Sequence, residues 1–149
     1  MKIQPWALKL LRENRIAHLA TSTTDGRPHV VPICYAWDVN NRVYSPIDKK
    51  PKRVKSQRLR RVLNILSNPN IALVVDSYSE NWDDLKYVKV DGQAKVLKRG
   101  RERQRAVRLL RRKYTQYRAM GIEHCPIIMV KTVRIVAWKS ADSHVKGKR

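Results

Sequence analysis

The stretch RIAHLATSTTDGRPHVVPICYAWD, residues 15–38, decides the fold because it predicts two apolar strands joined by a turn. Asp25 and Gly26 tolerate positive φ in that turn, and Pro28 restarts an extended chain. Apolar side chains occupy both faces of the second strand, which predicts that it is buried on both sides. Pro32 has no N–H for a sheet ladder. We therefore expect the backbone around Pro32 to leave its neighbouring strand and to face a flat ligand.

Apolar periodicity and turn residues predict the other elements of the chain. We expect helices over 5–14, 57–67 and 100–120, and strands over 16–23, 29–38, 42–47, 71–76, 87–96, 127–130 and 132–138. Short strands without a regular βαβ alternation predict a mainly β fold, an antiparallel barrel with flanking helices. Gly92 is expected to form a β-bulge. A single domain is expected over residues 1–139, followed by a flexible basic tail over 140–149.

The charge of the chain is extreme. Its 149 residues include 33 Lys and Arg against 12 Asp and Glu, which gives a net charge of +21. The isoelectric point is about 10.7. Such a charge predicts attraction to anions that weakens with salt. Nucleic acid, an anionic membrane surface and a ligand with several phosphates and carboxylates all fit this charge, and so does a solvated basic surface without a specific partner.

Several classes of protein are disfavoured by what the sequence lacks. No apolar run approaches the roughly 18–20 residues that span a bilayer, so we expect a soluble protein without a membrane partner. Cys34 and Cys125 have no CxxC spacing, and no secretory leader precedes them, which favours free thiols in a cytoplasmic protein. The scattered histidines show no HExxH spacing, and no GxSxG, Walker or GxGxxG motif occurs. We therefore expect no metal site.

Five pieces of sequence follow one another in a characteristic order. They are LATSTTDGRPHVVPICYAWD, RVYSPIDKKPKR, RLRRVLNILSNPNIALVVDSY, a loop that contains Trp82, and KYVKVDGQAKV. This set, from about Ile16 to Trp138, resembles the pyridoxamine 5'-phosphate oxidase-like superfamily of flavin and deazaflavin split barrels, in particular its coenzyme F420-dependent branch. The resemblance implies a six-stranded antiparallel split β-barrel. It also implies a homodimer that holds its cofactor in grooves at the subunit interface.

Basic residues before and at the start of the second expected helix are candidates for binding the cofactor's anionic groups. Arg60 and Arg61 combine guanidinium donors with a helix N-terminus, which suits a phosphate, although a solvated helix face explains them too. By resemblance they take the place of the Arg-Lys pair that holds the flavin phosphate. In the deazaflavin branch the basic loop over residues 48–55 is where the phosphate and oligoglutamate tail are expected, and Lys50 and Lys52 are the candidates within it.

The resemblance also places residues around the ring of the cofactor. It implies that Tyr87 approaches the ring, where a tyrosine can stack or donate its hydroxyl. Ser45 is expected on the strand that faces the ring. The backbone of Pro32, Ile33 and Cys34 is expected to hydrogen-bond the ring edge. Without the family resemblance, the simpler interpretation is that each of these residues belongs to the core.

Taken together, these features predict a coenzyme F420-dependent oxidoreductase that transfers a hydride between the deazaflavin and a small-molecule substrate. Trp82 and Trp138 are expected to wall the substrate pocket, with ordinary packing as the alternative. FMN is the alternative cofactor. A nonenzymatic nucleic-acid binder is disfavoured because only 7% of the residues are aromatic and none is Phe. A protein that keeps the ligand for storage or sensing is a further alternative. The pyridoxamine phosphate oxidase reaction itself is disfavoured, because VAWKSADSHVKGKR lacks the Arg-x-His motif that grips that substrate.

Overall fold

The structure is a computed structural model that describes residues 1–48 and 59–140. Lys50 and Lys52, and the tail from residue 141 onward, lie outside the described residues. Ser140, which the sequence assigns to the tail, is buried, and its backbone N–H donates a 2.9 Å hydrogen bond to the Leu85 carbonyl. No helix in the described part of the chain is long and apolar enough to cross a membrane.

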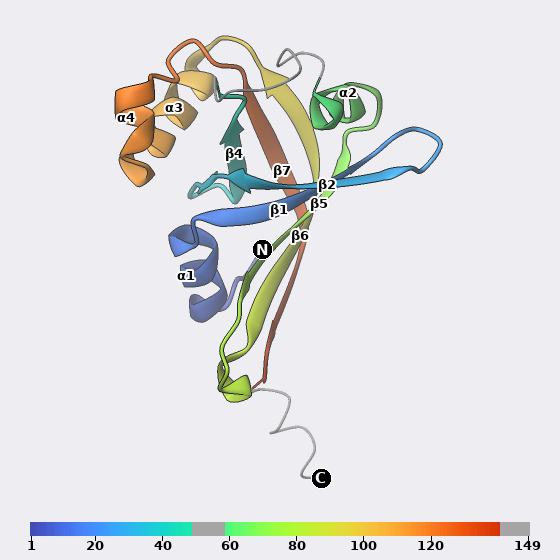
Figure 1. The fold of residues 1–149 in the computed structure, drawn as a ribbon, viewed down its shortest axis with the longest axis vertical. Coiled ribbons are helices and arrows are strands. Elements are labelled where there is room, and N and C mark those ends of the chain that lie inside the picture. Colours follow the sequence, from blue (N-terminus) through green and yellow to red (C-terminus); the bar gives the residue numbers. More distant parts are fainter. Residues whose placement is uncertain (49–58, 141–149) are drawn as a thin grey trace.

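The fold is mainly β, with helices packed around one sheet (Figure 1). The helices are α1 (Pro5–Glu13), α2 (Arg60–Ser67), α3 (Arg101–Lys113) and α4 (Gln116–Met120), with a 3-10 turn, η2, at Trp82–Asp84. The strands are β1 (Ile16–Ser22), β2 (Pro28–Cys34), β3 (Ala36–Trp37), β4 (Arg42–Pro46), β5 (Asn70–Ser77), β6 (Lys86–Leu97) and β7 (Ile127–Lys139). This confirms the expected class and most of the expected elements.

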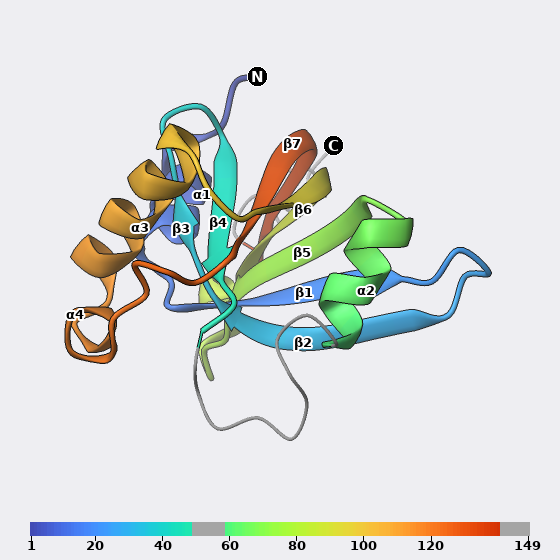
Figure 2. The ribbon, with the colours of Figure 1, turned by 90° about the horizontal axis from the view of Figure 1, so that it is seen from above.

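The seven strands form one antiparallel sheet in the order β2-β1-β5-β6-β7-β4-β3. The two edge strands, β2 and β3, are consecutive in the chain and are separated by the single residue Tyr35. The sheet must therefore curl until its edges approach each other, which gives the half-barrel seen in Figures 1 and 2. This architecture is consistent with a split barrel, although it has seven strands where the resemblance implies six.

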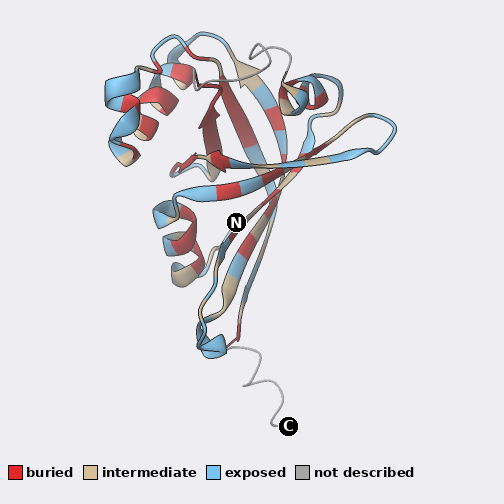
Figure 3. Ribbon diagram, viewed as in Figure 1, coloured by how far each residue is buried: buried red, intermediate tan, exposed pale blue. Residues whose placement is uncertain are grey.

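The core has two parts, one on each face of the sheet (Figure 3). Alternate residues of β7 separate them, because Ile128 and Val130 belong to one part whereas Ile127 and Met129 belong to the other. Inside the curved sheet, apolar residues of α1 and α2 complete the first part. On the outer face, α3 and α4 cover the second part over β4 and the first half of β7. Burial of these faces supplies the main stabilisation of the fold.

The expectation for the second strand was wrong in two respects. The strand is not buried on both sides, because Val30 and Pro32 are exposed while Ile33 is in the core. Pro32 also stays in register with β1, opposite His18. Both results follow from the position of β2 at the sheet edge, where a residue without an N–H is tolerated.

Two other elements differ from the sequence prediction. The helix expected over 100–120 divides into α3 and α4, because Tyr114 has extended backbone angles. The strands expected over 127–130 and 132–138 form the continuous strand β7. The bulge at Gly92 is confirmed by a register shift between β6 and β7. A Cβ there would lie 2.6 Å from Val130 Cγ1 and 2.7 Å from the Lys131 carbonyl oxygen, which explains the glycine.

Candidate cofactor site

Arg60 and Arg61 occupy the first two positions of α2, but their surroundings differ. Arg60 is exposed, whereas Arg61 is half-buried. The Arg61 Nε is fully buried and has no hydrogen-bond partner among the described residues. Burial lowers the pKa of Arg61, and the nearby Asp48 carboxylate acts in the opposite direction. Because buried donors in proteins are nearly always paired, Arg61 is prepared to bind an acceptor.

Two further hydrogen bonds lie at or just after the end of β4. Ser45, a buried residue of β4, donates a 2.7 Å hydrogen bond from Oγ to the Cys34 carbonyl at the end of β2. The Tyr117 hydroxyl donates a 3.4 Å hydrogen bond to Asp48 Oδ2. Burial is the main cause that raises the pKa of Tyr117, with smaller contributions from Cys34 and Asp48. The structure therefore brings the candidates Ser45 and Cys34 together.

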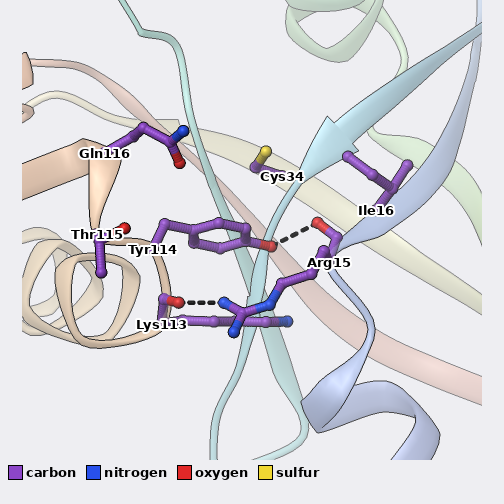
Figure 4. A pocket seen from close by; sticks show the side chains of 7 residues that line it. All are labelled: Arg15, Ile16, Cys34, Lys113, Tyr114, Thr115 and Gln116. Carbon is purple, nitrogen blue, oxygen red and sulfur yellow. Dashed lines mark hydrogen bonds between the residues drawn. The ribbon is translucent and has the colours of Figure 1, made fainter.

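A pocket of about 410 Å³ opens beside Cys34, at the end of α3 (Figure 4). Its lining includes Arg15, Lys113 and Tyr114. Tyr114 projects across the pocket, and its hydroxyl lies 2.6 Å from the Arg15 carbonyl and 2.9 Å from the Tyr35 carbonyl. The same hydroxyl accepts a 3.0 Å hydrogen bond from the Tyr35 N–H. These bonds hold the residue that links the two sheet edges.

Lys113 differs from a typical surface lysine in its contacts and in its pKa. Its Nζ donates a 2.5 Å hydrogen bond to the Asn14 carbonyl and lies 4.0 Å from the centre of the Tyr35 ring. Both contacts favour the ammonium form. Burial outweighs them and, together with repulsion from Arg15, lowers the pKa of Lys113 to about 8. Burial also raises the pKa of Tyr114 to about 12. Sequence reasoning missed Lys113, since a lysine at a helix end gives no signal of burial.

Tyr87 and Trp138 form a cross-strand pair between β6 and β7. Their ring centroids are 5.7 Å apart with an interplanar angle of 24°, and both side chains are 38% exposed. Tyr87 lies at the start of β6, and Trp138 lies opposite it near the end of β7. Ala94, seven residues further along β6, donates a 2.8 Å backbone hydrogen bond to the carbonyl of Pro69, just after α2. At a rise of about 3.4 Å per residue, this separation is about 24 Å. One chain therefore does not bring Tyr87 and Trp138 together with Arg61.

The remaining candidates have simpler positions. Trp82 lies in η2 and is 67% exposed. The side chain of Ile33 is in the core, and that of Pro32 faces solvent. Within the described sheet β2 pairs only with β1, so the backbone groups on its other edge have no ladder partner. The described residues contain no group of three or more His, Cys, Asp or Glu side chains that could hold a metal ion.

The fold and this geometry agree with the comparison to known proteins. A family model described as pyridoxamine 5'-phosphate oxidase matches residues 3–137. The chain belongs to this family. The superfamily indicated by the ordered sequence pieces is thus confirmed, while its deazaflavin branch stays a prediction. Among curated proteins, none matches the sequence significantly.

Solved structures share the family fold at low sequence identity. A conserved hypothetical protein from Mycobacterium tuberculosis is 15% identical with a TM-score of 0.76, over 97% of this chain and 89% of that chain. HutZ, a heme storage protein from Vibrio cholerae, is 14% identical with a TM-score of 0.67, over 93% and 95%. An FAD-binding protein from Mesorhizobium loti is 20% identical with a TM-score of 0.64, over 91% and 94%.

Proposed function

We propose that this member of the pyridoxamine 5'-phosphate oxidase family is a coenzyme F420-dependent oxidoreductase that transfers a hydride between the deazaflavin and a small-molecule substrate. FMN is the alternative cofactor at the same site, since the family binds flavins. The observation that carries the proposal is Arg61, whose buried Nε has no partner among the described residues. A cofactor phosphate supplies the acceptor that this donor needs.

The residues at the start of α2 fit the phosphate in charge and in geometry. Arg61 is partly shielded from water, which strengthens a charge-assisted hydrogen bond, and the backbone N–H groups of the first turn favour an anion. Arg60 is exposed and adds a weaker, screened attraction. Lys50 and Lys52 are proposed to bind the anionic tail of the cofactor. They lie outside the described residues.

The position of the edge strand β2 supports a role for its backbone in holding the ring. Alternate residues of an antiparallel strand turn their backbone groups to the same side, and the Cys34 carbonyl, which accepts from Ser45, faces away from β1. The outer edge of β2 therefore offers the Cys34 N–H and the Pro32 carbonyl, whereas the backbone of Ile33 between them faces β1. Pro32 contributes only its carbonyl. Hydrogen bonds from such a backbone edge orient a flat ring. A bound deazaflavin supplies the hydride-carrying chemistry, and these residues supply its position.

We propose that a second copy of the chain completes the site. Tyr87 and Trp138 are far from Arg61 within one chain, yet their rings remain partly exposed on the outer face of the sheet. Below the area that α3 and α4 cover, this face also carries the half-buried side chains of Val74 and Val136. A homodimer that buries this face brings Tyr87 of one copy toward Arg61 of the other.

The pocket beside Cys34 is the proposed place of the substrate. It is of ligand size, at about 410 Å³, and its cations, Arg15 and Lys113, favour a substrate that carries an anionic group. The lowered pKa of Lys113 means that a large part of this charge is lost above about pH 8. The expectation that Trp82 and Trp138 wall the substrate pocket stays a prediction, because no contact among the described residues tests it.

Spectroscopy of the purified protein tests the proposed function. We expect a colourless protein that quenches the fluorescence of added deazaflavin at a stoichiometry of one cofactor per chain. A yellow protein with an oxidised-flavin absorbance band would replace the deazaflavin with FMN. A protein that binds neither cofactor but retains RNA tightly would overturn the oxidoreductase function and favour the nucleic-acid binder.

A further inference from the structure

A second basic cleft lies at the start of α3, away from α2. Figures 1 and 2 both place α2 and α3 on opposite sides of the sheet. The cleft has a volume of about 510 Å³. Among the described residues that line it, five are cations and one is a carboxylate: Lys98, Arg99, Arg103, Arg108, Arg111 and Glu123. Like charges gathered in one cleft repel one another and concentrate anions there.

Arg103 is the most informative of these cations, because only 8% of it is exposed. Its Nε donates a 3.2 Å hydrogen bond to the Cys125 carbonyl, and its Nη2 donates to the Glu123 carbonyl. It forms no ion pair with any carboxylate of the described residues. Neutral carbonyls fix the guanidinium without neutralising it, and three of its five N–H groups are not used in these two bonds. A buried charge without a counter-ion is costly, so an anion fits here.

The carboxylate of the cleft is already engaged. Glu123 Oε1 lies 2.5 Å from Arg111 Nη1, so this pair cancels one of the five positive charges and leaves four. The first turn of α3 also opens into the cleft at Gly100, and no side chain of the described residues caps it. Its backbone N–H groups therefore add further donors for an anion.

We propose that this cleft binds a small ligand that carries two or more phosphate groups, at a site separate from the cofactor phosphate at α2. The volume is in the range of ligand pockets, about 300–1,000 Å³. The described lining contains no Phe, Tyr or Trp, its one aromatic ring is the imidazole of His124, and Val107 is its one large aliphatic residue. A base therefore has only one small ring on which to stack, so the phosphates supply most of the binding, as in pyrophosphate or the tail of a nucleotide.

Calorimetric titration of the full chain with sodium tripolyphosphate tests this site. We expect saturable binding of one tripolyphosphate per chain. Replacing the exposed lining residues with Arg99→Ala and Arg108→Ala should weaken it at least about tenfold, since two charge-assisted contacts are lost. The matched control combines Arg101→Ala and Arg112→Ala, two exposed arginines of α3 that do not line the cleft. It removes the same charge and should change the affinity by no more than about twofold.

Three results would overturn the site. Equal losses of affinity in the two double variants would show that tripolyphosphate binds through the net charge of the protein and not through this cleft. A titration without saturation would show that no site exists. A short single-stranded RNA that binds more tightly than tripolyphosphate, and that depends on Arg99 and Arg108, would assign the surface to a macromolecule instead. Deazaflavin quenching should be unchanged in the Arg99→Ala, Arg108→Ala variant, so failure of this site and failure of the proposed cofactor site are distinguishable.

Discussion

Ser45 Oγ donates a 2.7 Å hydrogen bond to the Cys34 carbonyl, and this bond joins strands near opposite edges of the sheet. Cys34 ends β2, at one edge, while Ser45 lies on β4, next to the other edge. Tyr35 links the same two edges through the backbone, and the Tyr114 hydroxyl holds Tyr35 in place. The closure of the half-barrel at the proposed cofactor site therefore depends on a few polar contacts rather than on a ladder.

Ser45→Ala tests the contribution of this closure. The variant removes the donor from the Cys34 carbonyl, and Ser45 is only 3% exposed, so water does not readily replace it. We expect the free energy of unfolding in urea to fall by about 0.5–1.5 kcal/mol. Ser67→Ala is the control, since the exposed Ser67 also donates to a backbone carbonyl, and it should change the unfolding free energy by less than about 0.5 kcal/mol. Equal effects would contradict a special role for Ser45.

The sequence predicted the elements of the fold well wherever periodicity alone defines them. The amphipathic pattern of α2 is an example. The bulge at Gly92 was also predictable, because a glycine inside a strand is a local signal of its own. Prediction from the sequence failed where tertiary contacts decide. The break at Tyr114 depends on hydroxyl contacts with Tyr35 and Arg15, which are distant in the sequence. The exposure of Pro32 depends on the place of β2 in the strand order, which no local pattern encodes.

The candidate site was predictable only in part for the same reason. Arg60 and Arg61 look equivalent in the sequence, and only the packing of α2 shows that Arg61 is shielded. Tyr87 and Trp138 were assigned different roles, because their contact depends on the register between β6 and β7. Stacking across strands requires that register, and the sequence does not contain it explicitly.

Lys113 should make stability depend on pH. Its pKa is lowered from 10.5 to about 8 in the folded chain, so the unfolded chain binds more protons between these values. The free energy of unfolding should therefore rise as the pH increases from about 8 to about 10. Urea unfolding of the wild type and of Lys113→Met at several pH values measures this difference, and the variant should show the smaller rise.

A matched lysine variant separates this effect from the titration of other groups. Lys131→Met removes an exposed lysine of β7 and should leave the pH dependence of the wild type unchanged. If Lys113→Met and the wild type show parallel curves, burial does not shift the pKa of Lys113, and the charge of the pocket beside Cys34 is constant over this range.

The uncovered outer face of the sheet predicts a homodimer. Sedimentation velocity of the wild type should give about twice the chain mass. Val136→Glu places a charge beside the Trp138 and Tyr87 pair, where it would be buried in the dimer, and should produce monomers. Val39→Glu is the control, because Val39 is 83% exposed in a turn and away from this face. A wild-type monomer that binds cofactor at micromolar concentration would contradict the shared site.

Arg61 should contribute more to cofactor affinity than Arg60, although the two are neighbours with the same charge. Arg61→Ala removes a shielded donor and should weaken deazaflavin binding by about 1.5–3 kcal/mol, whereas Arg60→Ala removes an exposed one and should cost less than about 1 kcal/mol. Fluorescence quenching titrations measure both affinities. The free energy of unfolding without cofactor should not fall in Arg61→Ala, since burial of its charge opposes folding. Equal losses of affinity in the two variants would show that net charge, and not a phosphate site at Arg61, governs binding.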